Sequence, residues 1–126
     1  MSDYFFDTYA LHKIKEGNES YRPYGGQAGI ATTKLNLMEL YYSYFVKQGR
    51  NAAEEAFNEF KDFCVGISDE TIKESASLRA EIKAKVKGSN ISFVDCIGYV
   101  LAKKLRIKFL TGDREFEGLD NVEFVK

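Results

Sequence analysis

The chain has 126 residues, a formal net charge of −1, 44% hydrophobic and 29% charged residues, and a single histidine. This length suits one compact domain, residues 1–126, and the composition is that of an ordinary folded protein rather than a disordered one. The near-neutral charge gives no overall attraction to nucleic acid, so such a partner would have to be held at a local basic patch or through a metal ion. Two isolated cysteines and one histidine argue against structural zinc.

The chain also lacks the patterns of membrane and secreted proteins. It contains no run of about 18 apolar residues. Residues 1–10 have neither the basic start nor the small-residue cleavage site of a secretory signal. We therefore expect a cytoplasmic protein that contacts no membrane.

The apolar pattern predicts strands that alternate with helices. In chain order we expect a strand over 4–6, a helix over 9–16, a loop over 17–29, helices over 34–48 and 52–62, a buried strand over 63–67, helices over 70–87 and 92–105, and strands over 107–111 and 122–125. The loop holds the only proline and four of the ten glycines, which is typical of a surface segment. Helices between strands predict an α/β fold in three layers, with a central, mainly parallel sheet covered by helices on both faces.

Four acidic residues are candidates for chemistry, although three of them have a structural explanation. Asp7 can cap the first helix, Asp95 can close the capping box that Ser92 begins, and Asp113 can be a turn residue after a strand. Glu39 is different, because the spacing of its helix puts it on one stripe with Leu35, Tyr42 and Val46. A carboxylate buried there needs a cation that faces it, which can be lysine, arginine or a metal ion.

The expected positions of these acids bring them together. Asp7 and Asp113 each follow a predicted strand, and ligands of an open parallel sheet bind beyond the carboxyl ends of its strands. Asp95 lies in the first turn of its helix, where Gly98 on the same side permits a close approach. Four converging carboxylates would repel one another without a divalent cation, and ligands that are all oxygen favour Mg²⁺ or Mn²⁺. Such ions activate water for phosphodiester hydrolysis, which is the chemistry of a nuclease.

Several segments together resemble a known family. These segments are FFDT near the start, TTKLNLMELYY around Glu39, SFVDCIGYVLA around Asp95, and LTGDREF around Asp113. Over essentially its whole length the sequence resembles PIN domains, and specifically the VapC toxins of prokaryotic VapBC toxin–antitoxin pairs. The four acids stand in the order that the family shows. The resemblance implies a Mg²⁺- or Mn²⁺-dependent endoribonuclease with Asp7, Glu39, Asp95 and Asp113 as catalytic and metal-binding residues, commonly a homodimer, inhibited by a small VapB-type antitoxin in the active-site groove.

Other side chains and other functions stay open at this point. Thr8 and Thr111 flank two of the acids and can hydrogen-bond a carboxylate, or simply favour the strand ends. Arg79 can reach a phosphate, or its stem can simply cover the core. Arg114 can likewise reach a phosphate, or be a solvated turn residue. His12 is given no role. The same fold could also serve as a non-catalytic module that binds RNA or protein, or as a phospho-acceptor domain that uses an aspartate after a strand.

Overall fold

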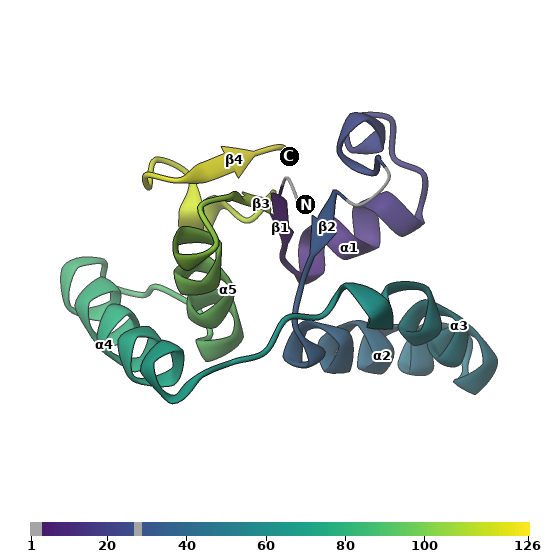
Figure 1. The fold of residues 1–126 in the computed structure, drawn as a ribbon, viewed down its shortest axis with the longest axis horizontal. Coiled ribbons are helices and arrows are strands. Elements are labelled where there is room, and N and C mark those ends of the chain that lie inside the picture. Colours follow the sequence, from purple (N-terminus) through teal and green to yellow (C-terminus); the bar gives the residue numbers. More distant parts are fainter. Residues whose placement is uncertain (1–3, 27–28) are drawn as a thin grey trace.

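A parallel sheet of four strands forms the centre of the molecule (Figure 1). The computed structural model describes residues 4–26 and 29–126. Within these ranges the strands lie in the spatial order β2 (Ile30–Ala31), β1 (Tyr4–Phe6), β3 (Lys108–Thr111), β4 (Val122–Phe124). All three pairings are parallel, and Phe5 of β1 is aligned with Ala31 on one side and Phe109 on the other. The predicted parallel α/β architecture is confirmed.

The sheet separates two apolar cores, because successive side chains of a strand point to opposite faces. Phe5 and Phe109 point into one core and stack with their ring centroids 5.9 Å apart, under helix α5 (Phe93–Lys104). Phe6 and Leu110 point into the other core, which α1 (Thr8–Lys15) covers. The three expected layers are therefore present.

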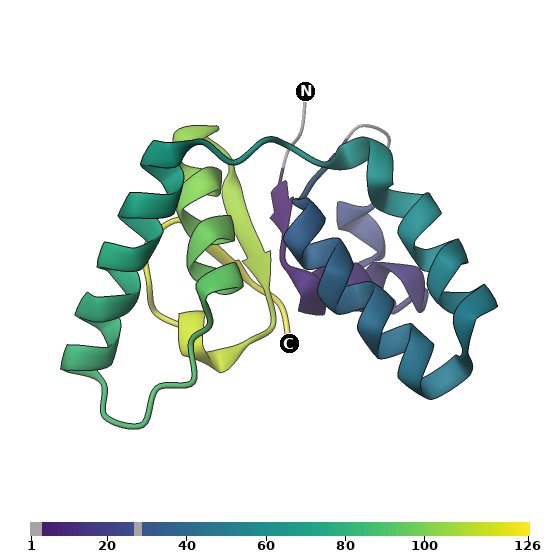
Figure 2. The same cartoon turned by 90° about the horizontal axis from the view of Figure 1, so that it is seen from below.

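The remaining helices form an outer wall on each side of the sheet. On the α1 side, α2 (Lys34–Gln48) and α3 (Arg50–Phe60) form the predicted helical hairpin, and Gly49 makes its turn at a φ of 95°. On the other side, α4 (Asp69–Lys85) packs against α5. Figure 2 shows the two helix pairs on opposite sides of the strands. None of the helices in the described ranges is long and apolar enough to cross a membrane.

The buried strand predicted over 63–67 is wrong. Lys61–Phe63 is a turn of 3-10 helix, and the extended chain after it touches the sheet through one isolated bridge between Cys64 and Thr32. The segment crosses from α3 to α4 along the outer edge of β2, and its residues are half-buried or exposed. The sequence of this segment has the apolar composition of a strand because its side chains pack against both cores. Its backbone, however, pairs with the sheet at one residue only.

The loop predicted over 17–29 is fixed by hydrogen bonds in the part that the structure describes. Residues 27 and 28 lie outside the described ranges. Arg22–Tyr24 forms a 3-10 turn, and Tyr21 beside it is fully buried, with its hydroxyl donating to the carbonyl of Val125. The Tyr24 hydroxyl donates to Glu123 of β4 at 2.7 Å. The first loop therefore holds the last strand in place.

Candidate active site

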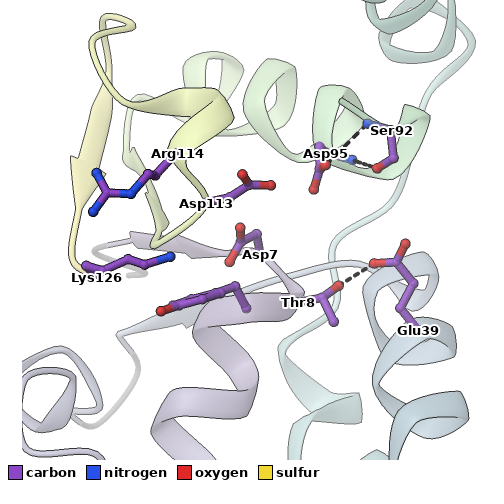
Figure 3. Close-up of a pocket in the computed structure, with 9 residues that line it drawn as sticks. Asp7, Thr8, Glu39, Ser92, Asp95, Asp113, Arg114 and Lys126 are labelled. Carbon is purple, nitrogen blue, oxygen red and sulfur yellow. Dashed lines mark hydrogen bonds between the residues drawn. The ribbon is translucent and has the colours of Figure 1, made fainter. Parts of the chain in front are cut away.

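A cleft of about 590 Å³ opens at the carboxyl ends of the strands. Its lining combines all four predicted acids with hydroxyl, phenol and cationic groups, namely Asp7, Thr8, Tyr9, Glu39, Ser92, Asp95, Asp113, Arg114 and Lys126. Figure 3 shows the carboxylates of Asp7, Asp95 and Asp113 directed toward a common space, with Glu39 across from them. The structure therefore brings the four candidates from four separate segments to one site.

Asp7 is the most deeply buried of the four acids, with 2% of its surface exposed. It caps α1, because its Oδ1 accepts the backbone N–H of Ala10 at 2.7 Å, and its Oδ2 accepts the hydroxyl of Thr111. Burial raises the pKa of Asp7 to about 8, against the two hydrogen bonds, and the charges of Asp95 and Asp113 add to the rise. Asp7 is thus both a helix cap and the floor of the cleft.

Asp95 likewise combines a structural role with a place in the cleft. Its Oδ2 accepts the N–H of Ser92 at 3.3 Å while the Ser92 hydroxyl accepts the N–H of Asp95 at 3.0 Å, which completes the predicted capping box. Burial raises the pKa of Asp95 to about 6, and the charges of Asp113 and Glu39 contribute.

The surroundings of Glu39 on its helix differ from those that the sequence pattern predicted. Tyr42 and Val46 of its predicted apolar stripe are 70% and 63% exposed, so the prediction that this stripe is buried is wrong. Helix α2 instead packs through Leu37, Leu40 and Tyr44. Glu39 lies at the border of that face, half-buried, and its partner is the hydroxyl of Thr8 at 2.5 Å rather than a cation.

A chain of buried polar groups stands behind Glu39. The Thr33 hydroxyl donates to Asn36 Oδ1 at 2.6 Å, and Asn36 Nδ2 donates to Thr8 Oγ1 at 3.2 Å. Thr8 then donates to Glu39. Asn36 is 1% exposed, so its amide is fixed by these contacts and orients the Thr8 hydroxyl. The predicted contact between Thr8 and a carboxylate is confirmed, whereas Asn36 was missed.

Thr111 connects Asp7 to Asp113 in a similar way. Its hydroxyl donates to Asp7 and accepts the backbone N–H of Asp113 at 3.0 Å. The Asp113 carboxylate accepts the N–H of Glu115 at 2.9 Å, which starts the short helix Arg114–Phe116. The predicted hydrogen bond between Thr111 and an acid is confirmed, and the turn role of Asp113 coexists with its position in the cleft.

Arg79, a candidate for phosphate binding, and His12, which was given no role, both lie away from the cleft. Arg79 donates through Nε to the carbonyl of Ile91 at 3.1 Å, and its guanidinium lies 4.3 Å from the centroid of the Phe93 ring. It therefore supports the segment that leads into α5. His12 stacks on Tyr44 with centroids 5.3 Å apart and is not part of the cleft lining.

Sequence reasoning missed Tyr9 and Lys126, which both line the cleft. Lys126 lies two residues after β4 ends. The rule that pointed to Asp7 and Asp113, namely that parallel strands end at one edge of the sheet, also applies to this last strand and could have found it.

The donor set fits a hard divalent cation. All four acids offer oxygen, and none of them forms an ion pair with another described residue. Burial raises the pKa of both Asp7 and Asp95, and neighbouring carboxylates add to the rise, so a bound cation would favour their charged forms. Among the described residues, no group of three or more His, Cys, Asp or Glu side chains lies close enough together to hold a metal ion. Mg²⁺ keeps several waters and is bound through one or two carboxylates, so at most two of these acids would contact it directly.

A parallel α/β domain with its candidate site at the carboxyl ends of the strands is the class of protein that this fold defines. A sequence profile of the PIN domain matches residues 4–122, and the chain belongs to this family. No curated protein matches the sequence.

Several solved structures with the same fold are described as toxins or as toxin–antitoxin complexes. DNA-bound VapBC from Salmonella typhimurium is 19% identical, with a TM-score of 0.75 over 99% of this chain and 98% of that one. VapC20 of Mycobacterium tuberculosis, described as a toxin that cleaves the sarcin-ricin loop, is 14% identical, with a TM-score of 0.73 over 96% and 98%. A toxin–antitoxin complex from Klebsiella pneumoniae is 20% identical, with a TM-score of 0.72 over 96% of both chains. At these identities the similarity defines the fold alone.

Proposed function

We propose that this protein is a VapC-like endoribonuclease that depends on Mg²⁺ or Mn²⁺. The observation that carries the proposal is the convergence of four carboxylates in one open cleft, with Asp7 buried, Asp95 half-buried, both pKa values raised, and none of the four paired with a cation among the described residues. Keeping such a cluster costs folding free energy, because each buried charge loses hydration and repels its neighbours. A bound divalent ion offsets that cost.

Asp7, Glu39, Asp95 and Asp113 would hold the ion, directly or through water. When bound, the ion would supply activation of a hydrolytic water and stabilisation of the charge that develops on a phosphodiester. The protein's own contribution is the orientation of these carboxylates. Thr111 fixes the Asp7 carboxylate, and the chain from Asn36 through Thr8 fixes Glu39.

The proposed substrate is RNA and the proposed partner is a small antitoxin. VapC20, which shares the fold, cleaves the sarcin-ricin loop, and two structures with this fold contain an antitoxin. An apolar pocket beside the cleft shares Thr8 and Glu39 with it and is also lined by Met38 and Tyr42, which are 59% and 70% exposed. Such a surface suits a protein partner that covers the cleft. Homodimer formation, which the family resemblance implies, stays a prediction.

A non-catalytic module that binds RNA or protein is the alternative. It would retain the fold without needing the carboxylate cluster, since a site freed from catalysis gains nothing from unpaired buried charge. The complete set of four acids favours the enzyme.

Cleavage of a fluorescently quenched single-stranded RNA tests the proposal. We expect activity with Mg²⁺ that EDTA removes and that Asp95→Asn lowers by at least about a hundredfold, because one ligand charge is lost. Asp62→Asn, the same change at an exposed position outside the cleft, serves as the control and should leave activity unchanged. Equal Mg²⁺-dependent activity in wild type and Asp95→Asn would refute the assignment.

A further inference from the structure

The cleft has a cationic side that its acids do not explain. Among the described residues, the basic side chains that line it are those of Arg114 and Lys126. Figure 3 shows both on the β4 side, next to Asp113 and Asp7, with Asp95 and Glu39 farther across the cleft. A nucleic-acid strand that lies along the cleft therefore meets carboxylates along its length and cations only at the β4 end.

Lys126 is held at this edge without a neutralising partner. Its Nζ donates to the carbonyl of Gly112 at 3.3 Å and lies 5.4 Å from the centroid of the Tyr9 ring. It forms no salt bridge with any described residue. Arg114 differs, because its Nη1 is paired with Glu117 at 3.0 Å. Lys126 is therefore the cation of this edge whose charge is free for a ligand.

The Tyr9 ring beneath this lysine is fixed by tight packing. A Cβ on Gly112 would lie 2.2 Å from Tyr9 Cε1 and 2.6 Å from the carbonyl oxygen of Val125, so only glycine leaves room for the ring at this point. Tyr9 also packs against Tyr21, with ring centroids 6.2 Å apart. The ring and the Gly112 carbonyl together hold the ammonium group over the rim of the cleft.

We propose that Lys126, supported by Tyr9 and Gly112, binds the RNA phosphate that neighbours the scissile one. The inference rests on the proposed ribonuclease function. A strand whose scissile phosphate sits at the acids has its adjoining phosphates near carboxylates that repel them. A fixed ammonium group at one end of the cleft attracts one of these phosphates, which offsets the repulsion and determines the direction in which the strand lies. Lys126 positions substrate and takes no part in the hydrolytic step.

The test measures RNA binding apart from cleavage. A 5′-fluorescein-labelled single-stranded RNA of mixed sequence is titrated with protein in Mg²⁺, followed by fluorescence anisotropy, at several salt concentrations. All proteins carry Asp7→Asn so that no cleavage interferes. Lys126→Met is compared with Lys126→Arg, which keeps the charge, and with Lys73→Met on the exposed face of α4 as the matched control.

We expect Lys126→Met to weaken binding about tenfold and to reduce the slope of log affinity against log salt by about 0.7, the share of one phosphate contact on a single strand. Lys126→Arg and Lys73→Met should keep the full slope. In otherwise wild-type protein, Lys126→Met should raise KM and leave kcat within about twofold. An unchanged slope would overturn the phosphate contact of Lys126 even if the wild-type protein cleaves RNA. A reduced slope in the absence of any cleavage by the wild-type protein would show that Lys126 contacts RNA, but would refute the ribonuclease and with it the position next to a scissile phosphate. Absence of RNA binding by all variants would overturn both.

Discussion

Replacing Asp7 by asparagine removes a charge from the most buried position of the cleft while keeping the shape of the side chain. The pKa of this carboxyl is about 8 in the folded protein, against 3.8 for an ordinary aspartate. At pH values between about 4 and 8, the Asp7 carboxyl therefore keeps its proton in the folded protein but has lost it in the unfolded chain. The free energy of unfolding is therefore not reduced by Asp7 below about pH 4. It falls as the pH rises above that value, and the loss is complete once the pH has passed about 8.

The pKa difference sets an upper limit of roughly 6 kcal/mol on this loss. Asparagine avoids it, because it carries no charge at any pH and its Oδ1 still accepts the N–H of Ala10. Its amide, however, replaces the oxygen that accepts the Thr111 hydroxyl, which costs about 1.5–3 kcal/mol. In EDTA at about pH 9 we therefore expect Asp7→Asn to be more stable than wild type by about 2–4 kcal/mol.

Urea denaturation followed by circular dichroism measures this difference. At about pH 4 the order should reverse and wild type should be the more stable protein, because its carboxyl is then neutral in the folded state and keeps the Thr111 hydrogen bond that asparagine loses. Saturating Mg²⁺ should stabilise wild type, by about 2.7 kcal/mol at a hundred times its Kd, and have little effect on the variant. Asp62→Asn controls for the loss of a surface charge. A variant that is less stable than wild type at high pH in EDTA would refute the reasoning.

Three further changes probe the supports of the site. Gly98→Ala should destabilise the protein by about 1–3 kcal/mol, since its Cβ would lie 2.6 Å from a Phe5 ring carbon and push α5 off the sheet. Gly66→Ala, whose Cβ meets nothing within 4 Å, should change the urea midpoint little. Asn36→Leu should lower the free energy of unfolding by about 1–3 kcal/mol in the same assay, because it removes the hydrogen bond to Thr8 behind the cleft. The same variant should bind Mg²⁺ more weakly. Unchanged Mg²⁺ affinity would contradict a role of Asn36 in orienting the site. Calorimetry should show Mg²⁺ affinity rising with pH through about 6 and again through about 8, where Asp95 and then Asp7 lose their protons. A flat profile would contradict direct competition between proton and metal.

The position of three of the acids followed from the sequence because strand ends and helix starts are local features. Asp7 and Asp113 come directly after strands of one parallel sheet, and Asp95 lies in a capping box, so topology alone brings them to one edge. Capping and binding proved compatible. A carboxylate that satisfies one backbone N–H keeps other lone pairs for a ligand.

The environment of Glu39 could not be predicted in the same way. Helix α2 is apolar on several sides, and periodicity does not decide which side packs on the core when more than one is apolar. Met38, Tyr42 and Val46 are exposed, whereas the core takes Leu40 and Tyr44. That choice depends on where α1 and α3 lie, which is tertiary information.

Short or crossing segments set a second limit on prediction. The two residues of β2 are too few to show a period of two, and the crossing segment 63–67 has a strand's composition without a strand's neighbours. Asn36 was missed because an asparagine within a helix has no distinctive pattern until the partners of its amide are known.

The central claim is that the four-acid cleft cleaves RNA with a divalent ion. Its most direct test is the mapping of new RNA 5′ ends in total cellular RNA after incubation with wild-type protein, with Mg²⁺ or with EDTA, and with Asp95→Asn. The account predicts discrete new ends that appear only with wild type and Mg²⁺. New ends that persist in EDTA, or that Asp95→Asn produces equally, would contradict it.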